Sequence, residues 1–488
     1  MANRLPNLLI VMTDHQRGDT VLAEHPARTP NVERLAAEGV TFTEAFCPTP
    51  HCCPSRATFM SGLMPSGHGI WNNVLNRQAL RTSLHEGVRL WSESLAAAGY
   101  AMHYSGKWHV SAEERPADRG WIEHDATATE KLAHGRDWEH FAEFADAPEP
   151  AERGEGEVLV PGWRADGRYR LYGENRGNAA DERTTDHAAR LVRELAGSEA
   201  PWCVYAGLVG PHDPFIVPQK YLDMYNLDEI PLPANYSDTM EDKPRVYQRM
   251  RSDRFGQLSE REVREGIRHF WAYCTYLDDM FGRILSALEE SGQAEDTAVL
   301  FCSDHGDYCG EHGLFCKGIP CFRGAYHVPA VVRWPQGLAN PGRRVDRLVS
   351  LADFAPTFLE LAGLEVPEGL YGRSLMPFLR DRGPDSWRDA LITQCNGVEL
   401  YFTQRSVLTK QHRYTFNGFD FDELYDLEKD PGETVNLAAD DSRAGLRREL
   451  CAKLMKLNSE AGDACPSAYI TVGLHPWGPA EAFRNKPS

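Results

Sequence analysis

The stretch TAVLFCSDHGD, residues 297 to 307, decides the class of fold. Its first six residues form a short and mostly apolar run, which predicts a buried strand. The run stops at Ser303, and the acidic and polar residues up to Asp307 are of the types that suit a turn. A buried strand that ends in a polar loop is typical of open α/β sheets, because such sheets build their sites at the carboxyl ends of strands.

The same pattern recurs along the chain. Further buried strands are predicted at residues 7–13, 100–104, 202–209 and 328–333. Helices are predicted at residues 32–38, 92–98, 262–290 and 351–362. Strands that are separated by helices indicate a large, mostly parallel sheet with helices on both faces.

The pattern changes after about Arg380. Short strands are predicted at residues 390–394, 401–407 and 412–416, and a helix at 443–459. We therefore expect a catalytic α/β domain at 1–380 and a smaller α+β subdomain with an antiparallel sheet at 381–488. The last twenty residues, with their Pro and Gly, could wrap the main domain or a second subunit. Residues 139–195 are acidic, Gly-rich and polar, which indicates surface excursions and loops near the site.

Composition limits the classes of function. The chain has 488 residues, of which 42% are apolar and 25% charged, as in soluble globular proteins. A net charge of −19 argues against a general binder of nucleic acid or anionic membrane, since both need a cationic face. No run approaches the roughly 20 apolar residues of a membrane span, and the run 8–12 is too short for a signal peptide. We therefore expect a cytoplasmic protein.

The cysteines fit that expectation. The chain has twelve, and a cytoplasmic protein keeps them as free or buried thiols. Those at 302, 309, 316 and 321 lack the Cys-x2-Cys pairs of a zinc site, so core thiols are the better interpretation.

Polar residues near the strand ends form a candidate site. Two carboxylates and an imidazole can hold a divalent cation, and Lys, Arg and His would surround an anion with positive charge. Taken singly, each residue has an ordinary explanation, such as a solvated lysine or a capping turn. The candidates are Asp14, Cys52, Arg56, Lys107, His109, His212, Asp304, His305 and Lys317.

The stretch HCCPSRATFMSG, residues 51 to 62, identifies a family. It contains the order Cys-x-Pro-Ser-Arg, three residues, Met, Ser and Gly, and through it the chain resembles the type I sulfatases of the alkaline phosphatase superfamily. The resemblance extends from the first strand to ELYDLEKDPGETVNL at 423–437, roughly nine-tenths of the chain. It implies an alkaline phosphatase-like sheet and a sulfatase that hydrolyses a sulfate monoester of an aryl, alkyl or carbohydrate alcohol.

The resemblance also assigns the two adjacent thiols. Only Cys52 has one residue between itself and Pro54, so Cys52 is the implied site of oxidation to Cα-formylglycine, and Cys53 is a bystander. A dedicated formylglycine-generating enzyme would be a partner during maturation. A hydrated aldehyde carries two hydroxyls on one carbon: one attacks sulfur, and the other collapses to the carbonyl and expels sulfate.

The family pattern implies roles for the other candidates. Asp14, Asp304 and His305 match metal ligands, with the Cys52-derived hydroxyl completing the site. Calcium is the family default, and Mn²⁺ or Mg²⁺ are alternatives. Arg56 matches the residue that holds the formylglycine. Lys107 and His109 match the pair that grips sulfate and handles the diol proton. His212 and Lys317 match the pair that protonates the leaving oxygen or clamps the sulfate.

Two departures leave alternatives open. Many family members carry two aspartates where this chain has Asp14-His15. Three roles for His15 therefore stay open: it is a metal ligand, it points away from the site, or it shapes the pocket. His305 replaces a frequent Asn, as in the choline sulfatase and phosphonate monoester hydrolase branch. Phosphonate hydrolases tend to lack the Lys and His of Gly-Lys-Trp-His, so Lys107 and His109 favour a sulfate monoester. A phosphonate monoester or phosphodiester hydrolase is the alternative, and a non-catalytic metal-binding relative is a third hypothesis.

The alcohol that leaves is not defined by the motifs. The acidic stretch 139–157 could favour a cationic group such as choline, although a solvated surface loop is the simpler interpretation. A homo-oligomer is a further expectation, from the tail. Four aromatic residues could either line the pocket or pack in the core. They are Trp71, Trp108, Trp163 and Tyr172.

Overall fold

The computed structural model describes residues 5–76, 79–125, 152–160, 167–384, 386–397, 401–465, 467–475 and 478–480. An eight-stranded sheet lies at the centre of these residues. Its strands are β1 (Asn7–Thr13), β2 (Val40–Phe42), β4 (Ala101–Gly106), β5 (Ile122–Asp125), β8 (Trp202–Gly207), β9 (Thr297–Ser303), β10 (Ala330–Arg333) and β11 (Arg343–Val345). They are arranged in the order β11-β2-β10-β9-β1-β8-β4-β5.

The sheet is mixed and mostly parallel, as predicted. The strands from β9 through β1, β8 and β4 to β5 pair in parallel, whereas β10 runs antiparallel to β9 and β2. In the β1–β9 pair, Asn7 lies opposite Thr297 and Thr13 opposite Ser303. Because the two strands end in step, the next residues, Asp14 and Asp304, leave the sheet at the same edge.

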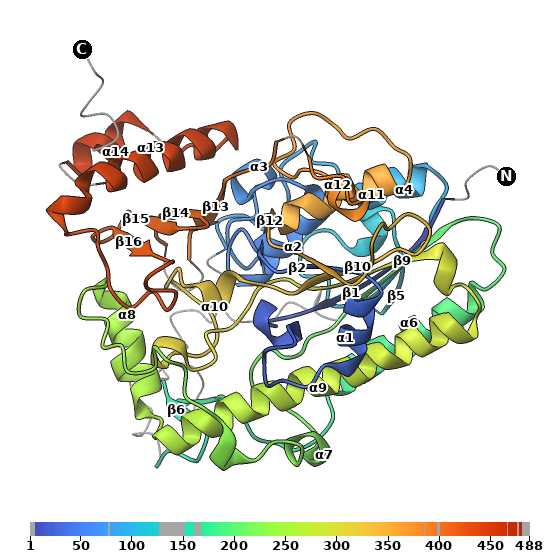
Figure 1. Cartoon of the computed structure of the whole chain (residues 1–488), viewed down its shortest axis with the longest axis horizontal. Coiled ribbons are helices and arrows are strands. Elements are labelled where there is room, and N and C mark those ends of the chain that lie inside the picture. The colour runs from blue at the N-terminus through green and yellow to red at the C-terminus, as the bar shows by residue number, and fades with distance from the viewer. Residues whose placement is uncertain are drawn as a thin grey trace.

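Helices cover both faces of the sheet (Figure 1). The long helix α9 (Glu260–Glu290) packs with α6 (Ala179–Glu194) and α1 (Pro30–Ala37) on one side. On the other side lie α2 (Cys52–Ser61), α4 (Trp91–Ala97) and α11 (Phe354–Leu361). The shorter elements are β3 (Ala45–Phe46), β12 (Val349–Ser350), α3 (Pro65–His68), α7 (Gln219–Leu222), α8 (Arg245–Arg249), α10 (Arg323–Tyr326), α12 (Met376–Leu379) and α14 (Ala468–Gly473).

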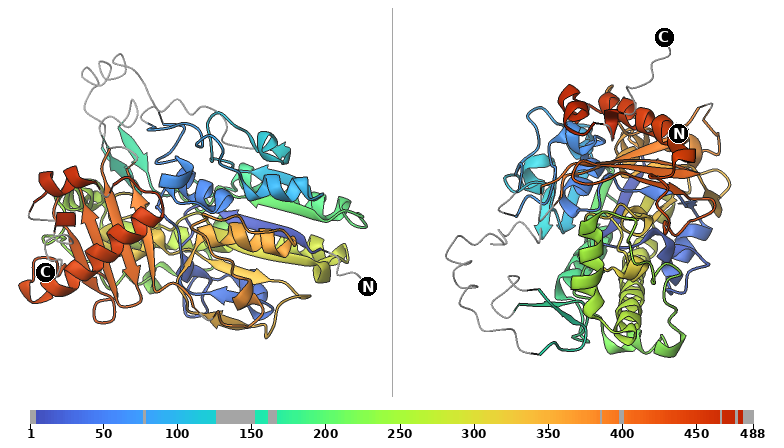
Figure 2. Two further views of the ribbon diagram at one scale, coloured as in Figure 1. Left: turned by 90° about the horizontal axis from the view of Figure 1, so that it is seen from above. Right: turned by 90° about the vertical axis from the view of Figure 1, so that its left-hand side faces the viewer.

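The C-terminal part is built on a four-stranded antiparallel sheet, as predicted. Its strands are β13 (Ala390–Cys395), β14 (Gln404–Thr409), β15 (His412–Asn417) and β16 (Glu423–Asp426), and helix α13 (Ala444–Glu460) lies across it (Figure 2). Ile392, Val407 and Leu454 belong to a separate apolar cluster between α13 and this sheet. The boundary at residue 380 stays a prediction.

Part of the segment 139–195 contradicts its interpretation as loops. Residues 126–151 and 161–166 lie outside the described part, but β6 (Glu157–Leu159) and β7 (Arg168–Arg170) form a hairpin, and α6 is a core-packed helix of 16 residues. Asn178 caps α6 by accepting hydrogen bonds from the next turn, and small or apolar residues such as Ala188 and Val192 are buried. The charged outer face of this helix hid its buried face in the sequence.

The cysteines and the helices of the described part bear on two of the predictions from the sequence. None of the twelve cysteines, all of which lie in the described part, forms a disulfide. Those at 302, 309, 316 and 321 are buried, and no three of them come together as metal ligands among the described residues. Within the same residues, no helix combines the length and the apolar character needed to cross a bilayer.

Candidate active site

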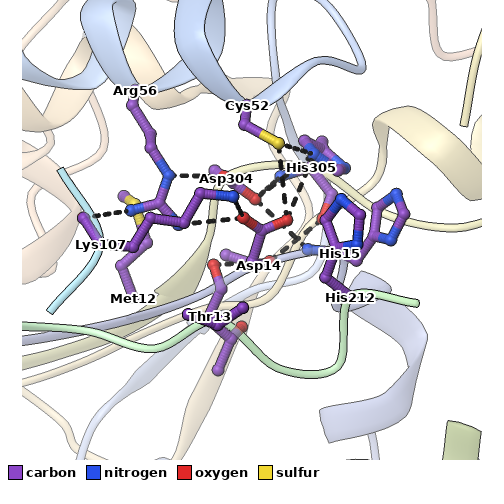
Figure 3. A network of polar contacts seen from close by, with 12 residues as sticks. Met12, Thr13, Asp14, His15, Cys52, Arg56, Lys107, His212, Asp304 and His305 are labelled. Carbon is purple, nitrogen blue, oxygen red and sulfur yellow. Dashed lines mark hydrogen bonds and ion pairs between the residues drawn. The ribbon is translucent and has the colours of Figure 1, made fainter. Parts of the chain in front are cut away.

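The candidate site lies at the carboxyl ends of the central strands. Asp14 follows β1, Lys107 follows β4, and Asp304 follows β9, while His212 comes from the loop after β8. Parallel neighbours bring these loops to one edge of the sheet, where α/β proteins place their sites. Figure 3 shows that side chains from these loops and from α2 point toward one shared centre.

Cys52, the first residue of α2, lies at this centre. Its Sγ is 3.3 Å from Nε2 of His305, 3.4 Å from Nζ of Lys317 and 3.7 Å from Oδ1 of Asp14. His109 also lies near this thiol and lowers its pKa. Burial raises the pKa of Cys52, but Lys107, Lys317 and His305 lower it by more and hold it well below the usual range.

The neighbouring thiol has different surroundings. Cys53 is fully buried, and its Sγ accepts a hydrogen bond from the backbone N–H of Val74 at 3.3 Å. Burial and the nearby Cys52 raise the pKa of Cys53 well above its usual range. Cys53 is therefore an inert core thiol, while the site is built around Cys52.

Four buried donors form a candidate metal site. The ligand atoms of Asp14, Cys52, Asp304 and His305 all lie within 4.8 Å of one another. His305 donates its Nδ1–H to the carbonyl of Gly306 at 3.0 Å, because a carbonyl can only accept. Its Nε2 lone pair then faces Asp14 Oδ1 at 3.6 Å and Asp304 Oδ1 at 3.7 Å. Two carboxylates and an imidazole held by a backbone carbonyl suit a divalent cation.

Two buried cations bind the same carboxylates. Arg56 donates from Nε to Asp304 Oδ2 at 2.7 Å and from Nη1 to the carbonyl of Lys107 at 3.0 Å. The ammonium of Lys107 contacts Asp14 directly. Burial and Cys52 raise the pKa of Asp14, but Lys107, His212 and Lys317 lower it by more. The pKa of Asp14 therefore lies below its usual range. Both carboxylates are therefore paired inside a site that largely excludes water.

His212 and Lys317 form the far side of the site. Nε2 of His212 lies 2.8 Å from Nζ of Lys317, and Nδ1 of His212 lies 2.8 Å from the carbonyl of Asp213. Since that carbonyl is an acceptor, Nδ1 carries a proton and Nε2 faces the centre. Burial and Lys317 lower the pKa of His212, whereas Asp213, Cys52 and Asp14 raise it, with a net rise. The side chain of His212 is 29% exposed, so this imidazole is open to a ligand.

His15 points into the site rather than away from it. Its ring is fully buried, stacks on His212 at 4.4 Å and meets the ring of His305 edge-on at 4.5 Å. Its Nδ1 lies 3.5 Å from Asp213 Oδ1 and 3.6 Å from Asp307 Oδ2. Burial, Lys317, His212 and His305 lower its pKa well below the usual range, so His15 is neutral. With Asp14 and His212 it also forms a second group whose possible ligand atoms lie within 4.8 Å of one another.

The structure thus brings together every predicted site residue, and it adds some that sequence reasoning missed. Asp213 and Asp307 follow His212 and His305 closely, so their position next to known candidates was a usable signal. Tyr169 on β7 also reaches the site, where its hydroxyl donates to Asp213. Nothing in its sequence context indicated this contact.

The predicted aromatic residues mostly pack. Trp108 is buried and donates its indole N–H to the carbonyl of Glu114 at 2.9 Å, and Tyr172 is buried against the ring of His269. Trp71 is half-buried beneath the guanidinium of Arg405, 5.8 Å from the ring centroid. Trp163 and most of the acidic stretch 139–157 lie outside the described residues.

Comparisons with known proteins agree with this geometry. The family profile described as Sulfatase matches residues 6–364, and the one described as N-sulphoglucosamine sulphohydrolase, C-terminal, matches residues 310–460. The chain is 28% identical to the uncharacterized sulfatase YidJ of Escherichia coli, over 97% of this chain and 90% of that protein. It is 29% identical to the choline-sulfatase of Rhizobium meliloti, over 90% of this chain and 83% of that protein.

A solved structure agrees as well. The phosphonate monoester hydrolase of Agrobacterium radiobacter is similar with a TM-score of 0.74 and 26% identity, over 93% of this chain and 96% of that chain. The sulfatase profile covers well over half of the present chain. The chain therefore belongs to the sulfatase family, the sulfuric ester hydrolases of the alkaline phosphatase superfamily.

Proposed function

We propose that the protein hydrolyses a sulfate monoester through a Cα-formylglycine made from Cys52. The position of Cys52 Sγ carries this proposal: it lies between the metal-ligand candidates and the basic residues, 3.3 Å from His305 and 3.4 Å from Lys317. The sulfur stands in for the oxygen that oxidation and hydration would put on the same carbon. The hydrated aldehyde supplies two hydroxyls on one carbon, one to take up the sulfuryl group and one whose collapse to a carbonyl releases sulfate.

We propose further that Asp14, Asp304, His305 and the Cys52-derived oxygen hold a divalent cation, with Ca²⁺ first and Mn²⁺ or Mg²⁺ as alternatives. The buried donor set fits such an ion, because these four ligand atoms lie within 4.8 Å of one another. When bound, the cation lowers the pKa of the attacking hydroxyl and neutralises charge on the sulfate oxygens.

The remaining side chains then have separate tasks. Lys107, His109 and Lys317 surround the sulfate with hydrogen-bond donors, and Arg56 holds Asp304 in place through its 2.7 Å contact. The His212–Lys317 pair gives a proton to the leaving oxygen through Nε2 of His212. This nitrogen accepts a hydrogen bond from the Lys317 ammonium at 2.8 Å, which supplies the proton, while Nδ1 is held by a backbone carbonyl at 2.8 Å. A positioned acid of this kind accelerates departure of an alkoxide by about a hundredfold or more.

The first experiment is mass spectrometry of the tryptic peptide 35–56 after thiol alkylation, from protein made together with a maturation enzyme. We expect an aldehyde at Cys52 and alkylated thiols at Cys53 and Cys47, which lie in the same peptide. Complete alkylation of all three thiols in protein from its own host would contradict the formylglycine mechanism.

The alternative is a phosphonate monoester or phosphodiester hydrolase, which the similarity to the Agrobacterium radiobacter enzyme keeps in view. Lys107 and His109 favour the sulfatase, because the resemblance of Gly-Lys-Trp-His to the family motif implies that they grip sulfate. Initial rates on an aryl sulfate and on the matching aryl phosphonate monoester distinguish the two, and we expect the sulfate to be faster. The maturation enzyme as a partner, a homo-oligomer, a cytoplasmic location and the nature of the alcohol stay predictions.

A further inference from the structure

A carboxylate and a phenol lie behind His212, on the side away from Lys317. Asp213 Oδ1 is 3.2 Å from Nδ1 of His212 and 3.5 Å from Nδ1 of His15. The other oxygen of this carboxylate, Oδ2, accepts a hydrogen bond from the hydroxyl of Tyr169. The side chain of Asp213 is only 9% exposed, so this contact is shielded from water.

These contacts hold the imidazole of His212 from several directions. Its Nδ1 donates to the backbone carbonyl of Asp213 at 2.8 Å and lies 3.2 Å from the carboxylate of the same residue. Its Nε2 edge faces Lys317 at 2.8 Å, and its face stacks on His15. The stacked His15 ring is itself next to the same carboxylate oxygen. Rotation of the His212 ring would therefore break the contact with Asp213 and turn Nε2 away from the side where Cys52 lies.

Tyr169 is in turn fixed by its own neighbours. It lies in the middle of β7, paired with Val158 of β6, and the guanidinium of Arg254 covers its ring at 4.7 Å from the centroid. The hydroxyl is also 3.0 Å from Sγ of Cys316, the residue before Lys317. The β6–β7 hairpin thus connects to both members of the His212–Lys317 pair.

We infer that Asp213 is a positioning residue that keeps Nε2 of His212 directed at the leaving oxygen, and that Tyr169 keeps Asp213 in place. Carboxylates behind functional histidines commonly orient the ring and fix which nitrogen faces the reaction. This inference rests on the proposed role of His212 as the acid, and neither Asp213 nor Tyr169 needs to touch the substrate.

The test uses aryl sulfates whose phenols differ in acidity, from 4-nitrophenyl sulfate to phenyl sulfate. The matured enzyme is compared with Asp213→Asn, His212→Gln and the double variant by kcat/KM. An acid matters most for the poor leaving group, so His212→Gln should lose about a hundredfold or more on phenyl sulfate and far less on 4-nitrophenyl sulfate. Asp213→Asn should show the same trend with a loss of about tenfold, and the double variant should be no slower than His212→Gln.

Two results would overturn the inference: an equal loss on every substrate for Asp213→Asn, or a double variant whose loss is the product of the single losses. Neither result contradicts the role of His212 as the acid, provided that the loss of kcat/KM in His212→Gln is still larger for phenyl sulfate than for 4-nitrophenyl sulfate. A His212→Gln variant without that dependence would instead contradict the proposed acid.

Two further variants guard against a folding defect. Tyr169→Phe removes only the hydroxyl that holds Asp213, and it should reproduce the leaving-group trend more weakly; a uniform loss would count against the inference. Asp228→Asn changes an exposed carboxylate to amide in the same way and should leave all rates unchanged.

Discussion

At the scale of single residues, the two adjacent thiols at the start of α2 differ through their neighbours. Both are buried, and burial alone raises the pKa of a thiol. At Cys52, Lys107, Lys317 and His305 together reverse this shift. At Cys53, Lys107 and Arg56 also lower the pKa, but by less than burial and Cys52 raise it. Cys53 instead receives a backbone N–H from Val74. The same amino acid therefore has a chemical role at one position and a packing role at the next.

Substitution of each thiol tests this difference. Cys52→Ser should lose activity by about a thousandfold or more, because a single hydroxyl cannot both accept and expel the sulfuryl group. Cys53→Ala should keep kcat within about twofold and lose about 1 kcal/mol of unfolding free energy, as expected for a small buried deletion. Both proteins are produced with the maturation enzyme and assayed on an aryl sulfate. An inactive Cys53→Ala beside an active Cys52→Ser would contradict the assignment.

Removal of the metal is the second prediction at this scale. Excess chelator should abolish turnover and lower the melting temperature, since an ion at a hundred times its Kd stabilises the fold by about 2.7 kcal/mol. Readdition of Ca²⁺, Mn²⁺ or Mg²⁺ one at a time identifies the ion that restores both. Asp304→Asn removes one ligand charge, so its melting temperature should no longer respond to the added ion. An unchanged response in that variant would exclude Asp304 from the ligand set.

At the scale of elements, α2 carries Cys52 and Arg56 into the site, and its far end is fixed by Gly62. Gly62 adopts the left-handed conformation, with φ of 74°, and donates its N–H to the carbonyl of Thr58 at 2.8 Å. Its own carbonyl accepts hydrogen bonds from Tyr371 and Gly372. A side chain at position 62 would also place its Cβ 3.0 Å from the Cβ of Ala355.

Gly62→Ala should therefore lower the unfolding free energy by about 1–2 kcal/mol, the cost of a left-handed non-glycine residue. Urea titration measures the loss, and kcat per folded molecule should stay within about twofold because Cys52 is at the opposite end of α2. Gly445→Ala is the matched control: a Cβ added at position 445 would meet no other atom within 4 Å beyond its own helix and chain neighbours, and Gly445 has no positive φ, so no loss is expected. Equal stability of Gly62→Ala and the parent protein would contradict the strain argument.

The arrangement of the elements also explains which site residues could be predicted from the sequence and which could not. Asp14, Lys107 and Asp304 were predictable because each directly follows a buried apolar strand, and parallel strands end at one edge. Cys52, Arg56 and Lys317 were also candidates, but none of them directly follows a strand of the central sheet, and their roles came from the family pattern. Tyr169 was missed because the approach of the β6–β7 hairpin depends on tertiary packing. The helical nature of α6 was missed because its exposed arginines and acids outweigh a narrow buried stripe.

At the scale of the whole molecule, buried neutral histidines make the fold sensitive to acid. Burial and the nearby His85 lower the pKa of His68 to about 3, and burial and Arg323 lower that of His327 to about 3. An unfolded histidine titrates near 6.5. Between pH 6.5 and 3 the unfolded chain binds protons that the folded chain does not. Folding stability from these groups is therefore present above pH 6.5 and is lost as the pH falls toward 3.

His68→Gln isolates one such group. Nδ1 of His68 accepts the N–H of Ile70 at 3.1 Å, and Nε2 lies 2.9 Å from the hydroxyl of Thr58, so the folded protein uses the neutral ring. Between pH 7.5 and 4.5 the parent protein should lose roughly 3 kcal/mol more unfolding free energy than His68→Gln, since each of the two pH units below 6.5 contributes about 1.4 kcal/mol for a histidine that stays unprotonated in the folded protein. Guanidinium titrations at a series of pH values measure the unfolding free energy of the parent protein and of His68→Gln as a function of pH. If the His68→Gln curve instead runs parallel to that of the parent, His68 is charged in the folded protein, and its environment must then supply a counter-charge.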